Sequence, residues 1–279
     1  MDAHESRQTR TGRAARGALA TLLAALSTGC LASTQQEVAL GDQYAAQVAQ
    51  QLPLIKDPEV ARYLRVLGDS IARVSDDRDL TWTFDVVDQD EVNAFAVPGG
   101  HIYVYRGLIE RMNTMSELAG VVGHEIAHVT QRHSMTQMRD QQRANIGMTI
   151  GCLVAPQVCN NQVSSTLVNL GSNAAFSKFS RNDEAEADRF GVAYVTRAGI
   201  DPRGMTSMFG VLMAERKRNP SGMEAFFASH PVEESRIEAT QAEIRKLDPA
   251  LLPSLTRDTP AFRAFKTRLQ ALPRRTPAR

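Results

Sequence analysis

Residues 124–128 read His124-Glu125-Ile126-Ala127-His128, and this H-E-x-x-H pattern decides the expected fold and chemistry. Positions i and i+4 of an α-helix lie on one face, so His124 and His128 can direct two imidazoles at a single point. Neutral imidazole is a preferred ligand of zinc, and a catalytic zinc site adds a third protein ligand and an open position for water. Glu125 lies about 100° around the helix from His124, where it can act as a general base. The pattern predicts a catalytic site with one Zn²⁺ per chain.

Apolar residues surround the pattern and indicate that its helix is buried: Leu118, Val121, Val122 and Ile126. Two unpaired imidazoles and a carboxylate would be costly in the interior, which disfavours a chance pair of surface histidines. A structural zinc module is another alternative, but it would need four closed protein ligands and would leave Glu125 without a use.

The third zinc ligand is expected on a second helix. The metzincin pattern requires a glycine at position 131 and a histidine at position 134, where this chain has Gln131 and Ser134. Thermolysin-like zincins instead use a glutamate from a downstream helix. Residues 180–191 are compatible with such a helix, on which Glu184 could ligate the metal while Asp188 accepts the free N–H of a ligand histidine. A solvated acidic helix face is the alternative.

Two further side chains near these motifs are not expected to reach the metal. His133 lies five residues after His128, and a continuing helix would turn it roughly 140° away from the metal face. Glu186 lies between Glu184 and Asp188 in sequence, and we expect it to face solvent.

Four motifs in this order resemble the M48 family of zinc metallopeptidases. The resemblance runs from about residue 35 to about residue 245, and it is closest to the soluble periplasmic branch of bacterial envelope quality-control peptidases. The motifs are the segment 93–104, the pattern at 124–128, the run from Glu184 to Asp188, and Ser229-His230-Pro231 with Arg236.

The resemblance implies a zinc-dependent endopeptidase of the bacterial cell envelope. Its substrates would be unfolded or misassembled envelope polypeptides, and the outer-membrane assembly machinery is a possible partner. A proteolytically latent chaperone or binding protein of outer-membrane assembly, retaining the zinc site, is the alternative. The intact Glu125 argues against that alternative.

His230 and Arg236 are the remaining candidates for catalysis. Pro231 is expected to end one segment and start a helix, so that His230 would lie at a helix entrance and Arg236 about one and a half turns inside. The resemblance suggests that His230 either stabilises the oxyanion or occupies the open zinc position and silences the enzyme. Arg236 would support the same charge or pair with Asp188.

Periodicity predicts an α+β fold, mostly helical, with a small β-sheet beside the active-site helix, and the resemblance implies that this fold is zincin-like. An edge strand could bind an extended peptide by β-augmentation, and residues 93–98 are the candidate. A hairpin that only packs the core is the alternative. The expected substrate-binding residues are Asn93, Ala94, Phe95 and Ala96. Helices are expected over 38–51, 58–74, 107–139, 183–198 and 201–218, and strands over 81–87, 93–97 and 101–105.

Residues 1–29 have the composition of a bacterial export signal, because basic residues precede an apolar run too short to span a membrane. Ser27 to Cys30 resembles a lipoprotein box, in which Cys30 would be diacylated, although Ser27 stands where a larger apolar residue is usual. Ordinary cleavage and an uncleaved anchor are the alternatives. Leu31 implies, in the resembling lipoproteins, passage to the outer membrane. We expect a periplasmic protein with a lipid anchor.

Cys152 and Cys159 form an even pair in the oxidising compartment implied by export, and we expect them to form a disulfide. Two buried free thiols are the alternative. Residues 140–180 are expected to form a lid over the active site, because about forty residues exceed the usual helix–helix connection. A helical hairpin packed permanently on the core is the alternative.

Composition sets the remaining limits. The 279 residues are 43% apolar, which suffices for one sizeable core, so residues 30–279 are expected to form one domain with a core at about 35–245 and a short tail. The formal net charge of +1 gives no indication of a nucleic-acid partner.

Overall fold

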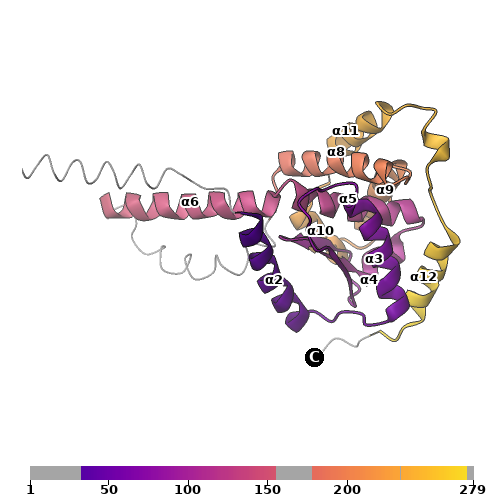
Figure 1. Cartoon of the computed structure of the whole chain (residues 1–279), viewed down its shortest axis with the longest axis horizontal. Helices are drawn as coiled ribbons and strands as arrows, with labels where there is room; N and C mark the ends of the chain where they lie inside the picture. Colours follow the sequence, from indigo (N-terminus) through magenta and orange to yellow (C-terminus); the bar gives the residue numbers. More distant parts are fainter. Residues whose placement is uncertain (1–32, 155–177, 233, 275–279) are drawn as a thin grey trace, which may run out of the picture. The chain divides into compact units, whose positions relative to one another are not determined.

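The computed structural model describes residues 33–154, 178–232 and 234–274 (Figure 1). Contacts divide the chain after Gln36, inside helix α2 (Thr34–Gln51), and almost every described residue belongs to the second unit, Glu37–Arg279. Within the described ranges, no helix combines the length and the apolar character that crossing a membrane requires.

The sheet has three strands, β1 (Thr83–Val87), β2 (Ala94–Val97) and β3 (His101–Tyr105), in the order β1-β3-β2. β1 runs parallel to β3, whereas β2 runs antiparallel to it and is joined to it by a tight turn. Gly99 and Gly100 in that turn have φ of 82° and 105°, which only glycine adopts without strain. Because the strand order is β1-β3-β2, β2 lies at one edge of the sheet.

The central helix, α5 (Met115–Thr130), carries the H-E-x-x-H pattern and is buried along almost its whole length. Thr114 begins it, because its side chain accepts a hydrogen bond from the backbone N–H of Glu117. α5 packs against the sheet and against α8 (Arg181–Arg197), the helix that carries Glu184 and Asp188. A Cβ at Gly123 would lie 2.8 Å from the side chain of Val195, so glycine permits the close approach that brings α5 and α8 together.

Helices α3 (Pro58–Ala72) and α9 (Arg203–Arg218) pack against α5, and α11 (Glu234–Arg245) packs against α8 (Figure 1). α8 begins with a capping box, in which Ser180 and Asp183 exchange hydrogen bonds between side chain and backbone. The remaining helical elements are α4 (Arg106–Arg111), α6 (His133–Val154), η3 (Ser221–Met223), α10 (Glu224–Ser229), η4 (Leu252–Ser254) and α12 (Pro260–Ala271).

The segment after residue 245 also contributes to the core. Phe262, Phe265 and Leu269 of α12 are buried, and α12 packs against α3. The side chain of Arg106 is itself buried and donates hydrogen bonds to the backbone carbonyls of Leu269, Leu272 and Pro273 at 2.6, 2.7 and 3.4 Å. These bonds hold the end of α12 against the first residue of α4.

The predicted fold class is confirmed, but the single helix predicted over 107–139 is wrong. The structure has three helices there, α4, α5 and α6. Thr114 caps a new helix after a break at Met112, and α5 ends before Arg132, whose φ is 56°. Left-handed backbone at a residue other than glycine is uncommon, so sequence periodicity did not reveal this second break.

Candidate metal site

Four buried side chains converge on one point in the interior. His124 and His128 come from α5, Glu184 from α8, and His230 from the residue that follows α10. One possible ligand atom from each of the four lies within 4.8 Å of the other three. The structure therefore brings together the two histidines and the glutamate that the sequence proposes as ligands, and adds His230 to them.

The donor atoms face one another rather than other partners. Nε2 of His128 lies 3.0 Å from Nε2 of His124 and 3.3 Å from Oε1 of Glu184. Two imidazole nitrogens and a carboxylate oxygen gathered at such distances are the donor set that zinc prefers. These residues fit a metal ion at this point.

Glu125 lies beside this cluster and is 1% exposed. Its Oε1 lies 3.6 Å from Nε2 of His230, and its Oε2 has no hydrogen-bond partner within the described part of the chain. Burial raises the pKa of this carboxyl group above its usual value. A buried carboxylate oxygen without a partner is costly unless something outside the chain contacts it.

Glu184 is held in its charged form by its neighbours. Burial alone would raise the pKa of this carboxyl group, but the charge of His230 and hydrogen bonds from His128 and His230 hold it well below its usual value. Nδ1 of His230 lies 3.0 Å from Oε1 of Glu184, and Arg236 donates to Oε2 of Glu184. The carboxylate is thus available as an anionic ligand.

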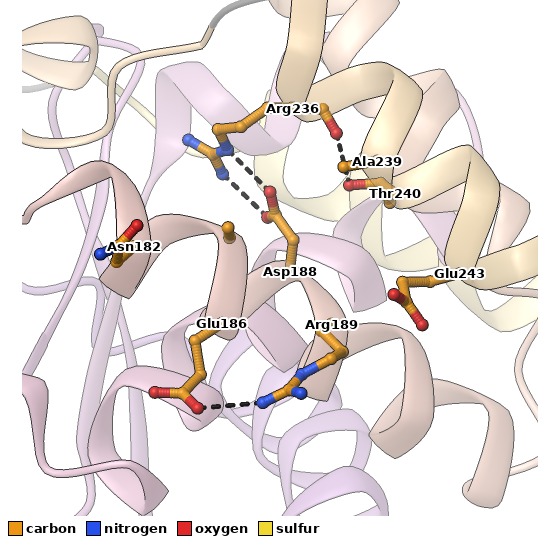
Figure 2. Close-up of a pocket in the computed structure, with 9 residues that line it drawn as sticks. Asn182, Glu186, Asp188, Arg189, Arg236, Ala239, Thr240 and Glu243 are labelled. Carbon is orange, nitrogen blue, oxygen red and sulfur yellow. Dashed lines mark hydrogen bonds and ion pairs between the residues drawn. The ribbon is translucent and has the colours of Figure 1, made fainter.

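Asp188 contacts the imidazole of His124. Its Oδ1 lies 2.9 Å from Nδ1 of His124. Arg236 binds the same carboxylate in a fork, with Nε donating to Oδ2 at 2.7 Å and Nη2 donating to Oδ1 at 2.8 Å (Figure 2). Of the two roles that the sequence left open for Arg236, the structure places it against Asp188. The predicted depth of Arg236 in its helix is wrong, because α11 begins at Glu234.

The predicted position of His230 at a helix entrance is also wrong. His230 is the C-cap of α10, and its N–H bonds to the carbonyl of Phe226 at 2.7 Å. Burial disfavours the imidazolium, but the carboxylates of Glu184 and Glu125 outweigh this effect and raise the pKa of His230 to about 8. His128 differs, because burial lowers its pKa well below the usual value.

His133 contacts the second histidine, contrary to the angle predicted from a continuing helix. Its Nδ1 lies 2.9 Å from Nδ1 of His128, and its Nε2 lies 3.3 Å from Oε2 of Glu186. The left-handed Arg132 separates α5 from α6, so His133 begins a new helix and turns back towards α5. Glu186 is partly exposed, as predicted, but it is bonded to this buried ring.

The expected substrate-binding segment includes the edge strand β2, which packs against α5. Ala94, Phe95 and Ala96 belong to the edge strand β2, and their side chains are buried. Asn93 precedes the strand, and its side-chain oxygen accepts a hydrogen bond from the N–H of Ala94 at 2.9 Å. The peptide-binding role of this segment stays a prediction.

Other predictions concern parts of the chain that the structure does not describe. Cys30 and Cys159 lie outside the described residues, as do residues 155–177 of the expected lid. Cys152 falls in α6, where its side chain is not described. Lipidation, the disulfide and the lid therefore stay predictions.

The sequence is similar to a known peptidase family and to several named proteins. The sequence model of "Peptidase family M48" matches residues 58–244. A "Beta-barrel assembly-enhancing protease" of Yersinia pestis is 32% identical over 230 residues, which are 80% of this chain and 47% of that protein. The protein of that name in Escherichia coli (strain K12) is 31% identical over 235 residues, 82% of this chain and 48% of its own length. "Metalloprotease LoiP" of Escherichia coli (strain K12) is 33% identical over 148 residues, 53% of this chain and 57% of its own length. The chain spans about half the length of these relatives.

Proposed function

This chain belongs to peptidase family M48, and from that premise we propose that it is a zinc-dependent endopeptidase of the bacterial cell envelope. The observation that carries the proposal is the convergence of His124, His128 and Glu184 beside Glu125, whose Oε2 has no partner among the described residues. The ligands that we assign to the metal are these two histidines and Glu184.

The catalytic roles follow from the positions of the side chains. Bound zinc would supply Lewis-acid activation of water and of the scissile carbonyl. Glu125 accepts the proton of the attacking water and passes it to the leaving amine, a task for which burial has raised its pKa. His230, 3.6 Å from Glu125, stabilises the oxyanion. The donors of Arg236 bond to Asp188, Glu184 and the carbonyl of Pro231, so we assign it a positioning role.

A latent state is the second candidate, and two contacts of His230 favour it. His230 lies 3.4 Å from Nε2 of His124 and 3.0 Å from Glu184, so it could serve as a fourth ligand. Four protein ligands characterise closed zinc sites, in which water has no position. In this state the chain would act as a binding protein or chaperone of outer-membrane assembly.

The substrates that we propose are unfolded or misassembled envelope polypeptides. The name of the relatives, "Beta-barrel assembly-enhancing protease", supports a role alongside the outer-membrane assembly machinery. The edge strand β2, preceded by Asn93, would bind an extended segment of such a polypeptide by β-augmentation. We propose a periplasmic location with Cys30 lipidated and anchored in the outer membrane, which mass spectrometry of membrane-derived protein would test.

The function is tested by comparing the purified chain with Glu125→Gln for zinc content and casein cleavage. We expect the variant to keep zinc and to lose proteolysis by several orders of magnitude, because only the proton acceptor is removed. Retained cleavage by a metal-loaded variant would refute the mechanism. His230→Ala distinguishes the two states: oxyanion stabilisation predicts a loss of cleavage of about 10²–10³-fold, and latency predicts a gain.

A further inference from the structure

The second ligand histidine contacts a chain of groups that the proposed function does not use. His133 is 4% exposed and lies edge-on to the ring of His128, with ring centroids 4.9 Å apart and an interplanar angle of 75°. The ring of Phe179 stacks on His128 from another side at 4.0 Å. His128 is therefore enclosed, and among the described residues its Nδ1 faces another imidazole, at 2.9 Å.

The position of His133 is fixed by the turn before it. Arg132 adopts φ of 56°, and its Nε lies 2.9 Å from Oε2 of the buried Glu37. Glu37 also pairs with Arg78, which donates in turn to the carbonyl of Val129 at the end of α5. The turn between α5 and α6 is thus held by three charged side chains.

The number of protons on each ring decides which nitrogen donates in the contact between His128 and His133. A neutral imidazole carries one proton, and it binds a metal through the nitrogen that lacks it. Nε2 of His128 faces His124 and Glu184, so a ligating His128 carries its proton on Nδ1 and donates it to Nδ1 of His133. His133 then carries its own proton on Nε2. That nitrogen faces Oε2 of Glu186, which is a carboxylate and can only accept.

The reverse arrangement would disable the ligand. If His133 carried its proton on Nδ1, it would donate to His128, and the proton of His128 would move to Nε2, at the point where the four ligand atoms converge. Glu186 disfavours this arrangement, because the unprotonated Nε2 of His133 would then face a carboxylate.

We propose that Glu186 and His133 form a positioning relay that holds His128 in the tautomer able to bind the metal. The inference rests on the proposed function in so far as His128 is a zinc ligand through Nε2. The partner groups of ligand histidines typically contribute 10–100-fold to metal affinity, so the expected effect is of that size. Neither residue touches the cluster of ligand atoms directly.

Two substitutions at His133 separate the relay from simple packing. His133→Phe keeps a ring of similar size but offers no acceptor to Nδ1 of His128. His133→Gln replaces the ring with an amide whose oxygen can accept that proton. We expect His133→Phe to weaken zinc binding about 10–100-fold, measured by competition with a chromophoric chelator, and His133→Gln to restore most of the affinity.

A matched pair of carboxylates tests the outer step. Glu186 and Glu243 line the same groove, where Figure 2 draws both, but Glu243 pairs with Lys246. Glu186→Gln should reduce zinc affinity, because its amide can also donate and so permits the disabled tautomer, whereas Glu243→Gln should leave the affinity unchanged. Equal zinc affinity in wild type, His133→Phe and Glu186→Gln would overturn the proposal.

The tautomers can be measured without an activity assay. In the metal-free protein Nε2 of His128 can donate to Glu184, 3.3 Å away, so the measurement uses the zinc-loaded protein. Long-range ¹⁵N–¹H NMR should show the proton of His128 on Nδ1 and the proton of His133 on Nε2. A proton on Nδ1 of His133 in protein that binds zinc would refute the relay alone, whereas wild-type protein that binds no zinc would refute the proposed function.

Discussion

The two histidines of the H-E-x-x-H pattern lie one turn apart on α5, yet their supporting contacts differ. His124 contacts Asp188, which is 3% exposed and held by the fork of Arg236. His128 contacts His133, which leads to Glu186, whose side chain is 41% exposed. The first support is a buried pair of charges, and the second runs in two steps from the interior to the surface. The two histidines of one motif are thus supported by groups that differ in burial and in charge.

Removing the carboxylate of the buried support should have the largest effect. Asp188→Ala leaves the buried Arg236 without its main partner, so we expect the free energy of unfolding to fall by about 3–5 kcal/mol. Urea unfolding of the metal-free protein, followed by circular dichroism, measures this change. Glu186→Ala is the matched control and should cost less than about 1 kcal/mol. Equal losses in both variants would remove the distinction between the two supports.

The pH dependence of the free energy of unfolding adds His230 to this comparison. The pKa of His230 is raised from 6.5 to about 8 in the fold, so the stability it contributes is present below pH 6.5 and is lost as pH rises through 8. The size of this loss is about 2 kcal/mol. His128 has the opposite sign, because its pKa is lowered and its contribution is lost as pH falls below 6.5.

The measurement is the free energy of unfolding of the metal-free protein between pH 5 and 9, compared with that of His230→Gln. The difference between the two proteins should shrink as pH rises from 6.5 to 8.5. A difference that stays constant over this range would contradict the assignment of the raised pKa to His230.

The turn that positions the second support gives a smaller effect. Arg132→Val and Arg132→Gly both lose the ion pair with Glu37, but only valine is strained at φ of 56°. We expect the valine variant to be less stable than the glycine variant by about 1–2 kcal/mol. It should also bind zinc more weakly, because His133 is displaced. Indistinguishable variants would show that the turn does not position His133.

The outermost contact should have the smallest effect. Arg189 is 54% exposed and pairs with Glu186 at 3.0 Å. An exposed pair of this kind contributes little, so Arg189→Ala should change the free energy of unfolding by less than about 0.5 kcal/mol and leave zinc affinity unchanged. A tenfold loss of zinc affinity would mean that the relay extends to Arg189.

Patterns within one helix were readable from the sequence, and patterns across a turn were not. The i, i+4 spacing placed His124 with His128 and Glu184 with Asp188, because each pair lies within a single helix. The contact of His133 depends on a left-handed residue that is not glycine and is held by Glu37, distant in sequence. The depth of Arg236 depends on where α11 begins, which is Glu234 rather than the predicted start at Pro231. Contacts between residues distant in sequence set the positions of His133 and Arg236, and local spacing does not predict such contacts.

The buried Arg106 ties the folding of this domain to a segment near the end of the described chain. Its three carbonyl partners lie at the end of α12, outside the residues that match the family, and more than 160 residues later in synthesis. A nascent chain that already contains α5 and α8 still exposes the surface on which Phe262 and Leu269 pack. Because domains fold as cooperative units, the packing around Arg106 is complete only once α12 has been synthesised.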